Sequence, residues 1–144
     1  FTYWKGKIKA GVSNAMVSQL DLFSSLAQLV GSDVRTDDSL PLMDLLMGKS
    51  DQGRDELVVE ATSRTAFKKG EWVMIPPYKG PSVNEKVQIE LGNYSDFQLY
   101  NLAEDIGQKN NLADSLPKKL QDMISAFEAI RGKGYGKTEK LELK

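Results

Sequence analysis

Carboxylates are the side chains in this sequence that come closest to acid–base chemistry. The acids beside predicted helices and strands are Asp37, Asp38, Asp51, Asp55, Glu56, Glu60 and Glu90. Two carboxylates can act as general acid and base, but Asp37 and Asp38 lie in a polar loop, where such residues usually form turns or cap helices. Glu60 ends an apolar strand, and an acid flanked by buried residues needs a partner. None of these acids defines a catalytic centre.

Two residue types that supply much enzyme chemistry are absent. The sequence holds no Cys, which excludes disulfides, thiolate nucleophiles and cysteine metal ligands. It also holds no His, which excludes an imidazole base or ligand. The glycine-containing stretches at 80–82 and 132–134 do not match the spacing of phosphate-binding loops. We therefore expect no catalytic residue and no metal site in this chain.

Four polar side chains lie on loops beside the predicted strands. Ser63 and Arg64 form a bend between two strands, and Tyr78 and Lys79 lie in a Pro-rich loop after a third strand. Arg can hold an anion with two hydrogen bonds, and Lys acts as a point charge. Loops on a rigid sheet can present such groups to a ligand. We predict that these four residues bind the anionic part of a substrate; ordinary surface turns with solvated cations are the alternative.

Length and charge limit the possible classes of protein. A chain of 144 residues is long enough to bury one core. Its 19 basic and 20 acidic residues leave a net charge of -1, which provides no broad positive field for a phosphate backbone. No apolar stretch approaches the ~20 residues that cross a bilayer. We predict one domain that binds neither nucleic acid nor membrane.

Helical periodicity appears near both ends of the chain. Apolar residues predict a helix over 18–30, with Gly31 as its cap, and a short helical turn over 42–47. Both apolar faces are expected in the core, the first through Met16, Leu20, Phe23, Leu26, Ala27 and Val30. A last helix begins near Pro117 and places Leu120, Met123, Ile124, Phe127 and Ile130 on one face.

Alternating and β-branched residues predict strands between these helices. The strands cover about 57–61, 65–67, 72–75, 87–91 and 97–102, and a tight turn at 68–71 joins two of them. We expect Phe67 and Trp72 to face the core and Lys68 and Lys69 to face solvent. Asn111 is expected to hold a strand-to-helix corner by bonding backbone groups. The fold class is therefore α+β: a small antiparallel sheet of about four strands packed against the C-terminal helix, plus an N-terminal helical segment.

Several motifs, read in order, resemble the C-terminal part of sulfatases of the arylsulfatase type. They are WKGKIKAG at 4–11 with the helix that follows, AFKKGEWVMI at 66–75, and QLYNLAEDIGQKNNLA at 98–113. Two further stretches, IPPYKGP at 75–81 and IELGN at 89–93, are similar to bacterial N-acetylgalactosamine-6-sulfatases. The resemblance covers about 4–130 and implies a sulfatase C-terminal subdomain over 1–130, with a Gly- and Lys-rich tail over 131–144.

The resemblance implies an active parent enzyme and an inactive chain. The family uses a formylglycine made in a Cys/Ser-x-Pro-Ser-Arg motif, bound calcium, and assisting Lys, His and Arg residues. Here Ser39-Leu40-Pro41 has the Ser-x-Pro spacing but lacks the Ser-Arg that should follow. The catalytic domain would then be a partner absent from this chain, and the chain would brace it and close one side of the substrate cleft.

Substrate and location also follow from the resemblance. The parent would hydrolyse sulfate esters of amino-sugar glycans, in the periplasm or outside a bacterial cell. One alternative function stays open at this point. A free-standing carbohydrate-binding or interaction module could use exposed aromatic side chains between Trp72 and Tyr94 as a sugar platform.

Overall fold

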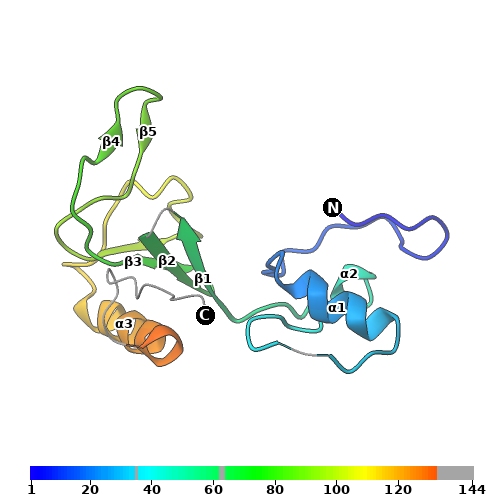
Figure 1. Ribbon diagram of the computed structural model, residues 1–144. Coiled ribbons are helices and arrows are strands. Elements are labelled where there is room, and N and C mark those ends of the chain that lie inside the picture. The colour runs from blue at the N-terminus through cyan, green and yellow to red at the C-terminus, as the bar shows by residue number, and fades with distance from the viewer. Residues whose placement is uncertain (35, 62–63, 133–144) are drawn as a thin grey trace, which may run out of the picture. The chain divides into compact units, whose positions relative to one another are not determined.

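The protein is represented by a computed structural model that describes residues 1–34, 36–61 and 64–132. The chain consists of two compact units, unit 1 (Phe1–Asp55) and unit 2 (Glu56–Lys144) (Figure 1). The division at residue 55 falls inside the single subdomain predicted for 1–130. Among the described residues, no helix is both long and apolar enough to cross a membrane.

Unit 1 contains two helices, α1 (Asp21–Leu29) and α2 (Met43–Leu46), at the places that periodicity predicted. Gly31 follows α1 with φ +73°, and Gly48 follows α2 with φ +69°. Only Gly adopts this left-handed conformation without a steric cost, so Gly31 ends its helix as expected and Gly48 ends α2 in the same way.

The inner face of α1 is polar, which contradicts the expectation from its apolar periodicity. Asp21, Ser24 and Ser25 are buried, whereas Phe23 and Leu26 are each 53% exposed. The exposed apolar set of this segment comprises Leu20, Leu22, Phe23, Leu26, Leu29 and Val30. The predicted core assignment of Leu20, Phe23, Leu26 and Val30 is therefore wrong for unit 1, because hydrogen bonds rather than apolar contacts fix the helix orientation.

A buried ion pair supplies the strongest of these bonds. Arg54 Nε donates to the two carboxylate oxygens of Asp21 at 3.0 and 2.8 Å, and Arg54 Nη2 donates to the backbone oxygen of Asp38. The carboxylate also accepts from the backbone N–H of Ser18 at 2.8 Å and of Leu40 at 2.9 Å. Burial raises the pKa of Asp21, but these hydrogen bonds and the Arg54 charge outweigh it, so the pKa lies below its ordinary value.

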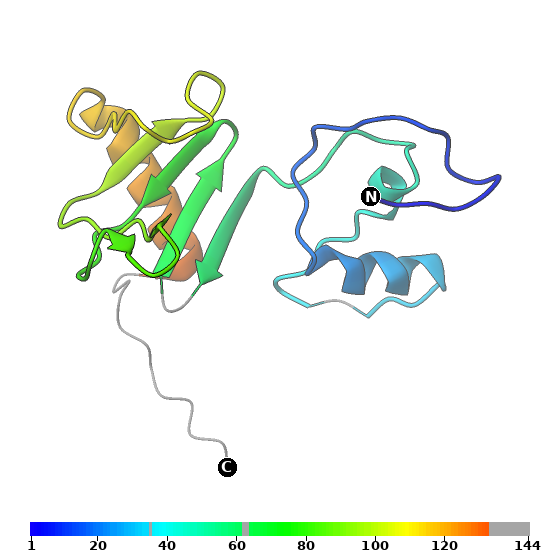
Figure 2. The ribbon, with the colours of Figure 1, turned by 90° about the horizontal axis from the view of Figure 1, so that it is seen from above.

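Unit 2 is an antiparallel sheet covered by one helix, which confirms the predicted α+β class (Figure 2). The sheet has the order β1-β2-β3-β6, built from β1 (Glu56–Ala61), β2 (Arg64–Lys69), β3 (Trp72–Ile75) and β6 (Gln98–Asn101). Helix α3 (Pro117–Arg131) lies across one face of it, and its first residue is the predicted Pro. Gly70, with φ +55°, makes the β2–β3 turn possible.

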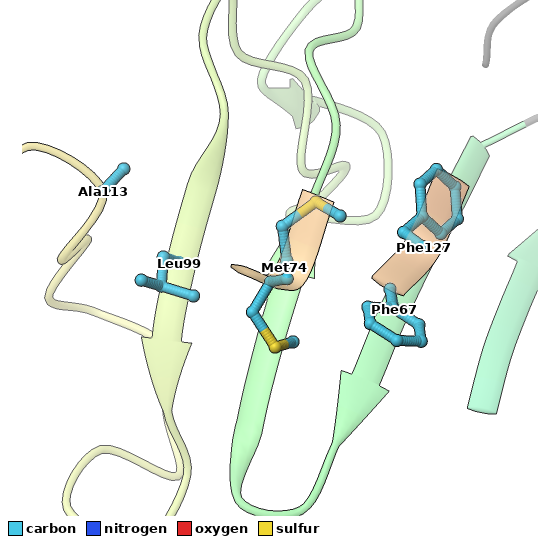
Figure 3. Packing of buried hydrophobic residues seen from close by; sticks show 6 residues of the cluster. Phe67, Met74, Leu99, Ala113 and Phe127 are labelled. Atoms are coloured by element: carbon cyan, nitrogen blue, oxygen red, sulfur yellow. The ribbon is translucent and has the colours of Figure 1, made fainter. Parts of the chain in front are cut away.

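The core of unit 2 lies between this sheet and α3. The register aligns Phe67, Met74 and Leu99 on neighbouring strands, and all three are fully buried (Figure 3). Phe127 reaches them from α3, with its ring centroid 5.8 Å from that of Phe67. Met123 and Ala113 complete the buried cluster. The predicted core role of Phe67 and of Leu120, Met123, Ile124 and Phe127 on α3 is confirmed, whereas Ile130, predicted on the same face, is 50% exposed.

Trp72 borders this core rather than filling it. The indole is only partly buried, and Lys119 Nζ lies 5.0 Å from its ring centroid. Lys69 is exposed as predicted and pairs with Glu56 at 2.8 Å. Lys68, which was also predicted to face solvent, is half-buried, and its ammonium group donates to the Gly70 carbonyl.

The predicted strand over 87–91 is the main error in unit 2. The chain forms a separate two-stranded ribbon there, β4 (Val83–Asn84) with β5 (Ile89–Glu90), outside the main sheet (Figure 1). Gln88 adopts φ +52°, which breaks an extended run. The main sheet has four strands, β1, β2, β3 and β6, and the sequence predicted each of them.

Asn111 occupies the corner between β6 and α3. Its side-chain oxygen accepts from the backbone N–H of Leu99 and of Ala113, both at 3.0 Å, and its amide nitrogen donates to the Phe97 carbonyl at 3.4 Å. Leu112 N–H donates to the Leu99 carbonyl at 2.8 Å. The corner is therefore bonded as the sequence predicted.

Replacing Asn111 with Ala should lower the free energy of unfolding of unit 2 by about 1 to 3 kcal/mol, since part-buried backbone groups lose their partners. Urea unfolding of the chain measures this. Asn110→Ala, at an exposed neighbour, is the matched control and should change stability by no more than about 0.5 kcal/mol. Equal urea midpoints for the two variants would remove the corner role.

Candidate functional site

The structure brings together two of the four predicted substrate-binding residues. Arg64 begins β2, and Tyr78 lies in the loop after β3, where its hydroxyl reaches the residue next to Arg64. Lys79 follows Tyr78 and is exposed. Ser63 lies outside the described residues.

The hydroxyl of Tyr78 is part of an internal joint. It accepts from the backbone N–H of Thr65 at 2.7 Å and shares a 2.6 Å hydrogen bond with the Thr65 hydroxyl. Arg131, in the last turn of α3, donates to that same Thr65 hydroxyl at 3.3 Å. At the other end of the residue, Tyr78 N–H donates to the Tyr94 carbonyl at 2.8 Å. Tyr78 thus connects the loop to β2, which is a structural role.

Arg64 takes part in a second joint, on the same loop. Its Nε donates to the side-chain oxygen of Asn93, and the Asn93 amide donates to the Pro81 carbonyl. Asn93 is only 5% exposed. Gly80 lies against this pair: a Cβ placed there would be 3.1 Å from Asn93 Nδ2 and 3.5 Å from Arg64 Nη2. The Arg64 guanidinium therefore lies beside the backbone that carries Lys79.

We call Arg64, Tyr78, Lys79 and Asn93 the loop cluster. It carries two cationic side chains, one of them exposed, and one buried amide. These groups can hold an anion, because guanidinium and ammonium groups donate charge-assisted hydrogen bonds. The cluster contains no acid, and the described residues contain no group of three or more acidic side chains that could hold a metal.

Sequence reasoning missed Thr65, Asn93 and Arg131. Asn93 is 29 residues from Arg64, and no local pattern connects them. Arg131 also pairs with Glu60 at 3.1 Å, which gives this acid the partner that its apolar neighbours required. The Glu60 side chain is nevertheless 46% exposed, so a buried acid is excluded there.

The aromatic side chains do not form a sugar platform. Among the described residues of 72–94, Tyr94 is the one exposed aromatic, at 56%. Trp72 lies under Lys119, and Tyr78 is held in the joint with Thr65. This arrangement does not favour the alternative of a free-standing carbohydrate-binding module.

Two sulfatases are similar to this chain, each with about one third of the matched residues identical. No family model matches the chain. An N-acetylgalactosamine-6-O-sulfatase of Bacteroides thetaiotaomicron is 33% identical over 132 residues, which is 89% of this chain and 26% of that protein. A solved sulfatase, described with the metabolism of multiple glycosaminoglycans by the same organism, has a TM-score of 0.82 at 32% identity, over 89% of this chain and 28% of its own.

A third relative shares the fold alone. The structure of a protein in complex with its substrate D-glucosamine-2-N,6-O-disulfate has a TM-score of 0.64 at 14% identity, over 92% of this chain and 28% of its own. The chain therefore spans about a quarter of the length of the relatives it matches.

Proposed function

We propose, from the homology of this chain to one segment of the sulfatases, that it is the C-terminal part of a sulfate-ester hydrolase. The observation that carries the proposal is the match at 33% identity over 89% of the chain, together with the TM-score of 0.82 to a solved sulfatase. The sulfatase relatives are sulfuric ester hydrolases, and this chain corresponds to a fragment of them. Sulfated amino-sugar glycans are the proposed substrates, because the curated relative is named for N-acetylgalactosamine 6-O-sulfate.

The proposed role of the chain is to brace the catalytic domain and close one side of its cleft. Ser39, in the Ser-x-Pro stretch at 39–41, cannot serve as the nucleophile precursor in its present setting. It is 6% exposed, its hydroxyl donates to the Leu20 carbonyl at 2.6 Å, and it accepts from Ser24 N–H at 2.9 Å. Nucleophile and calcium would both belong to the remainder of the parent, in a bacterial periplasm or outside the cell.

The proposal is tested by expressing the complete reading frame beside the 144-residue chain. The reading frame should encode a Cys/Ser-x-Pro-Ser-Arg motif upstream, and its product should release sulfate from 6-O-sulfated N-acetylgalactosamine glycans. The 144-residue chain should be inactive on glycans and aryl sulfates. Turnover by this chain above a heat-killed control, or an inactive full-length protein with an intact motif, would contradict the proposal.

The loop cluster is the proposed contact with the substrate. Lys79 is exposed, the next residue Gly80 lies against the Arg64 guanidinium, and Ser63 adjoins Arg64 in sequence. Arg and Lys side chains suit a sulfate or uronate group of a glycan. Tyr78 contributes by fixing the loop, since its hydroxyl is bonded to Thr65.

Arg64→Ala in the full-length enzyme should raise KM for the sulfated glycan about tenfold, as expected for one lost charge-assisted hydrogen bond. Turnover of a small aryl sulfate should not change, because that substrate does not reach the loop. Lys79→Ala should act in the same direction without disturbing Asn93, and Lys118→Ala, at an exposed position of α3, is the control. Equal effects on both substrates would assign Arg64 to folding alone.

A further inference from the structure

The outward side of α1 carries a continuous apolar stripe. Leu22, Leu26 and Leu29 follow one another at helical spacing, and Phe23 and Val30 flank them. Residues at these spacings share one face of a helix. Their exposed fractions run from 43% for Leu22 to 77% for Val30. We call these five residues the α1 stripe.

Hydrogen bonds on the opposite side prevent the stripe from turning inward. The Ser24 hydroxyl donates to the Ser39 carbonyl at 3.0 Å, and the Ser25 hydroxyl accepts from Leu42 N–H at 2.9 Å. Asp21 is held by Arg54 on the same side. A rotation of α1 that buried the stripe within unit 1 would break all of these contacts and leave buried polar groups unpaired.

Helix α3 shows what a solvent-facing helix looks like in this chain. Its exposed positions include Lys118, Gln121, Asp122 and Ser125, while Met123 and Phe127 are buried. In α1 the one charged residue is Asp21, which is 2% exposed. An uncharged apolar helix face of this kind is typical of a surface that another protein surface covers.

We propose that the α1 stripe docks on an uncharged apolar surface of the parent sulfatase outside this chain. This inference rests on the proposed function. The chain spans 26% of the curated relative and 28% of the solved one, so such a parent has about three quarters of its mass elsewhere. Unit 1 then packs through α1 against the remainder of the parent, whereas unit 2 has a core of its own.

The stripe can be tested by thiol labelling, since the chain contains no Cys of its own. Leu26→Cys and, as a matched control, Gln121→Cys on the exposed side of α3 are introduced into the full-length protein. Mass spectrometry measures the rate at which maleimide modifies the introduced thiol in the folded protein and in denaturant. The ratio of the denatured to the folded rate gives the protection of that thiol. We expect the Leu26→Cys thiol to be protected at least a hundredfold and the Gln121→Cys thiol less than threefold.

The same Leu26→Cys substitution in the 144-residue chain should give a reactive thiol at every protein concentration. Protection that grows with concentration would mean that a second copy covers the stripe, and it would overturn the inference. A reactive Leu26→Cys thiol in a full-length protein that hydrolyses sulfate esters would overturn the inference alone. A reading frame limited to these 144 residues would overturn both the inference and the proposed function.

Discussion

Phe127→Ala is expected to lower the free energy of unfolding of unit 2 by about 3 to 5 kcal/mol. The side chain is completely buried and packs against Phe67 with a centroid separation of 5.8 Å. The buried cluster contains six residues, Phe67, Met74, Leu99, Ala113, Met123 and Phe127, so few neighbours can move to fill the cavity. Such a loss is a large part of the stability of a small domain.

The measurement is urea unfolding followed by the fluorescence of Trp72, in a Trp4→Phe background so that unit 1 carries no indole. Ile130→Ala, on the same helix but at a position that is 50% exposed, is the matched control. It should shift the free energy of unfolding by less than about 1 kcal/mol, because little apolar area is lost. Similar values for both variants would place Phe127 outside the core.

Asp21→Asn should destabilise unit 1 by about 3 to 5 kcal/mol, because it leaves the Arg54 guanidinium buried without its counter-charge. The side chains of Arg54 and Asp21 are only 13% and 3% exposed. Amide exchange in the peptides of 18–30 reports this loss, and protection should fall by about two to three orders of magnitude, since about 1.4 kcal/mol corresponds to a factor of ten.

Asp44→Asn is the control for this variant. Asp44 and Lys49 form an ion pair in the same unit, at 3.8 Å, with side chains 67% and 64% exposed. An exposed pair contributes at most about 1 kcal/mol. If Asp44→Asn and Asp21→Asn reduced the protection of α1 equally, burial would not be the source of the Asp21 effect.

Acidification should erase the difference between wild type and Asp21→Asn. The pKa of Asp21 is lowered in the folded unit, so the unfolded chain takes up the proton first as the pH falls. The stabilisation is complete above the ordinary Asp pKa of about 3.9 and disappears as the pH falls through the lower folded-state pKa. The urea midpoint of α1 is measured at a series of pH values, each sample being read by an amide-exchange pulse at one fixed pH. The midpoints of the two proteins should begin to converge as the pH falls below about 3.9. A constant difference at acid pH would assign the effect to shape rather than charge.

Local patterns predicted unit 2 better than unit 1, and packing explains why. In α3 the apolar residues Met123 and Phe127 pack against the sheet of their own unit, so the face that periodicity predicted is the face that is buried there. In α1 the same periodic signal identified an apolar face correctly, but polar bonds from Asp21 and Ser24 hold the other face inward. Periodicity states that a helix has an apolar side; it does not state which surface covers that side.

The candidate site was predictable only in part for a similar reason. Arg64 and Tyr78 were identified from their loop positions, and the structure does bring their loops together. Thr65 and Asn93 join these loops, but the predicted strand at 65–67 and the motif at 89–93 did not indicate their partners, which lie 13 and 29 residues away. Hydrogen bonds between residues so far apart in the chain follow no regular spacing, so a single sequence does not reveal them.

Three hydrogen bonds connect the two ends of the loop at 79–93, and they bear on how the length of this loop can change. Tyr78 N–H bonds the Tyr94 carbonyl, Leu91 N–H bonds the Ser82 carbonyl at 2.7 Å, and the Asn93 amide bonds the Pro81 carbonyl. The two chain segments that lead into and out of the β4–β5 ribbon are therefore hydrogen-bonded to each other. Doubling a loop's length adds only about 0.6 kcal/mol of closure entropy. We therefore expect insertions and deletions between 83 and 90 to leave β3 and β6 undisturbed.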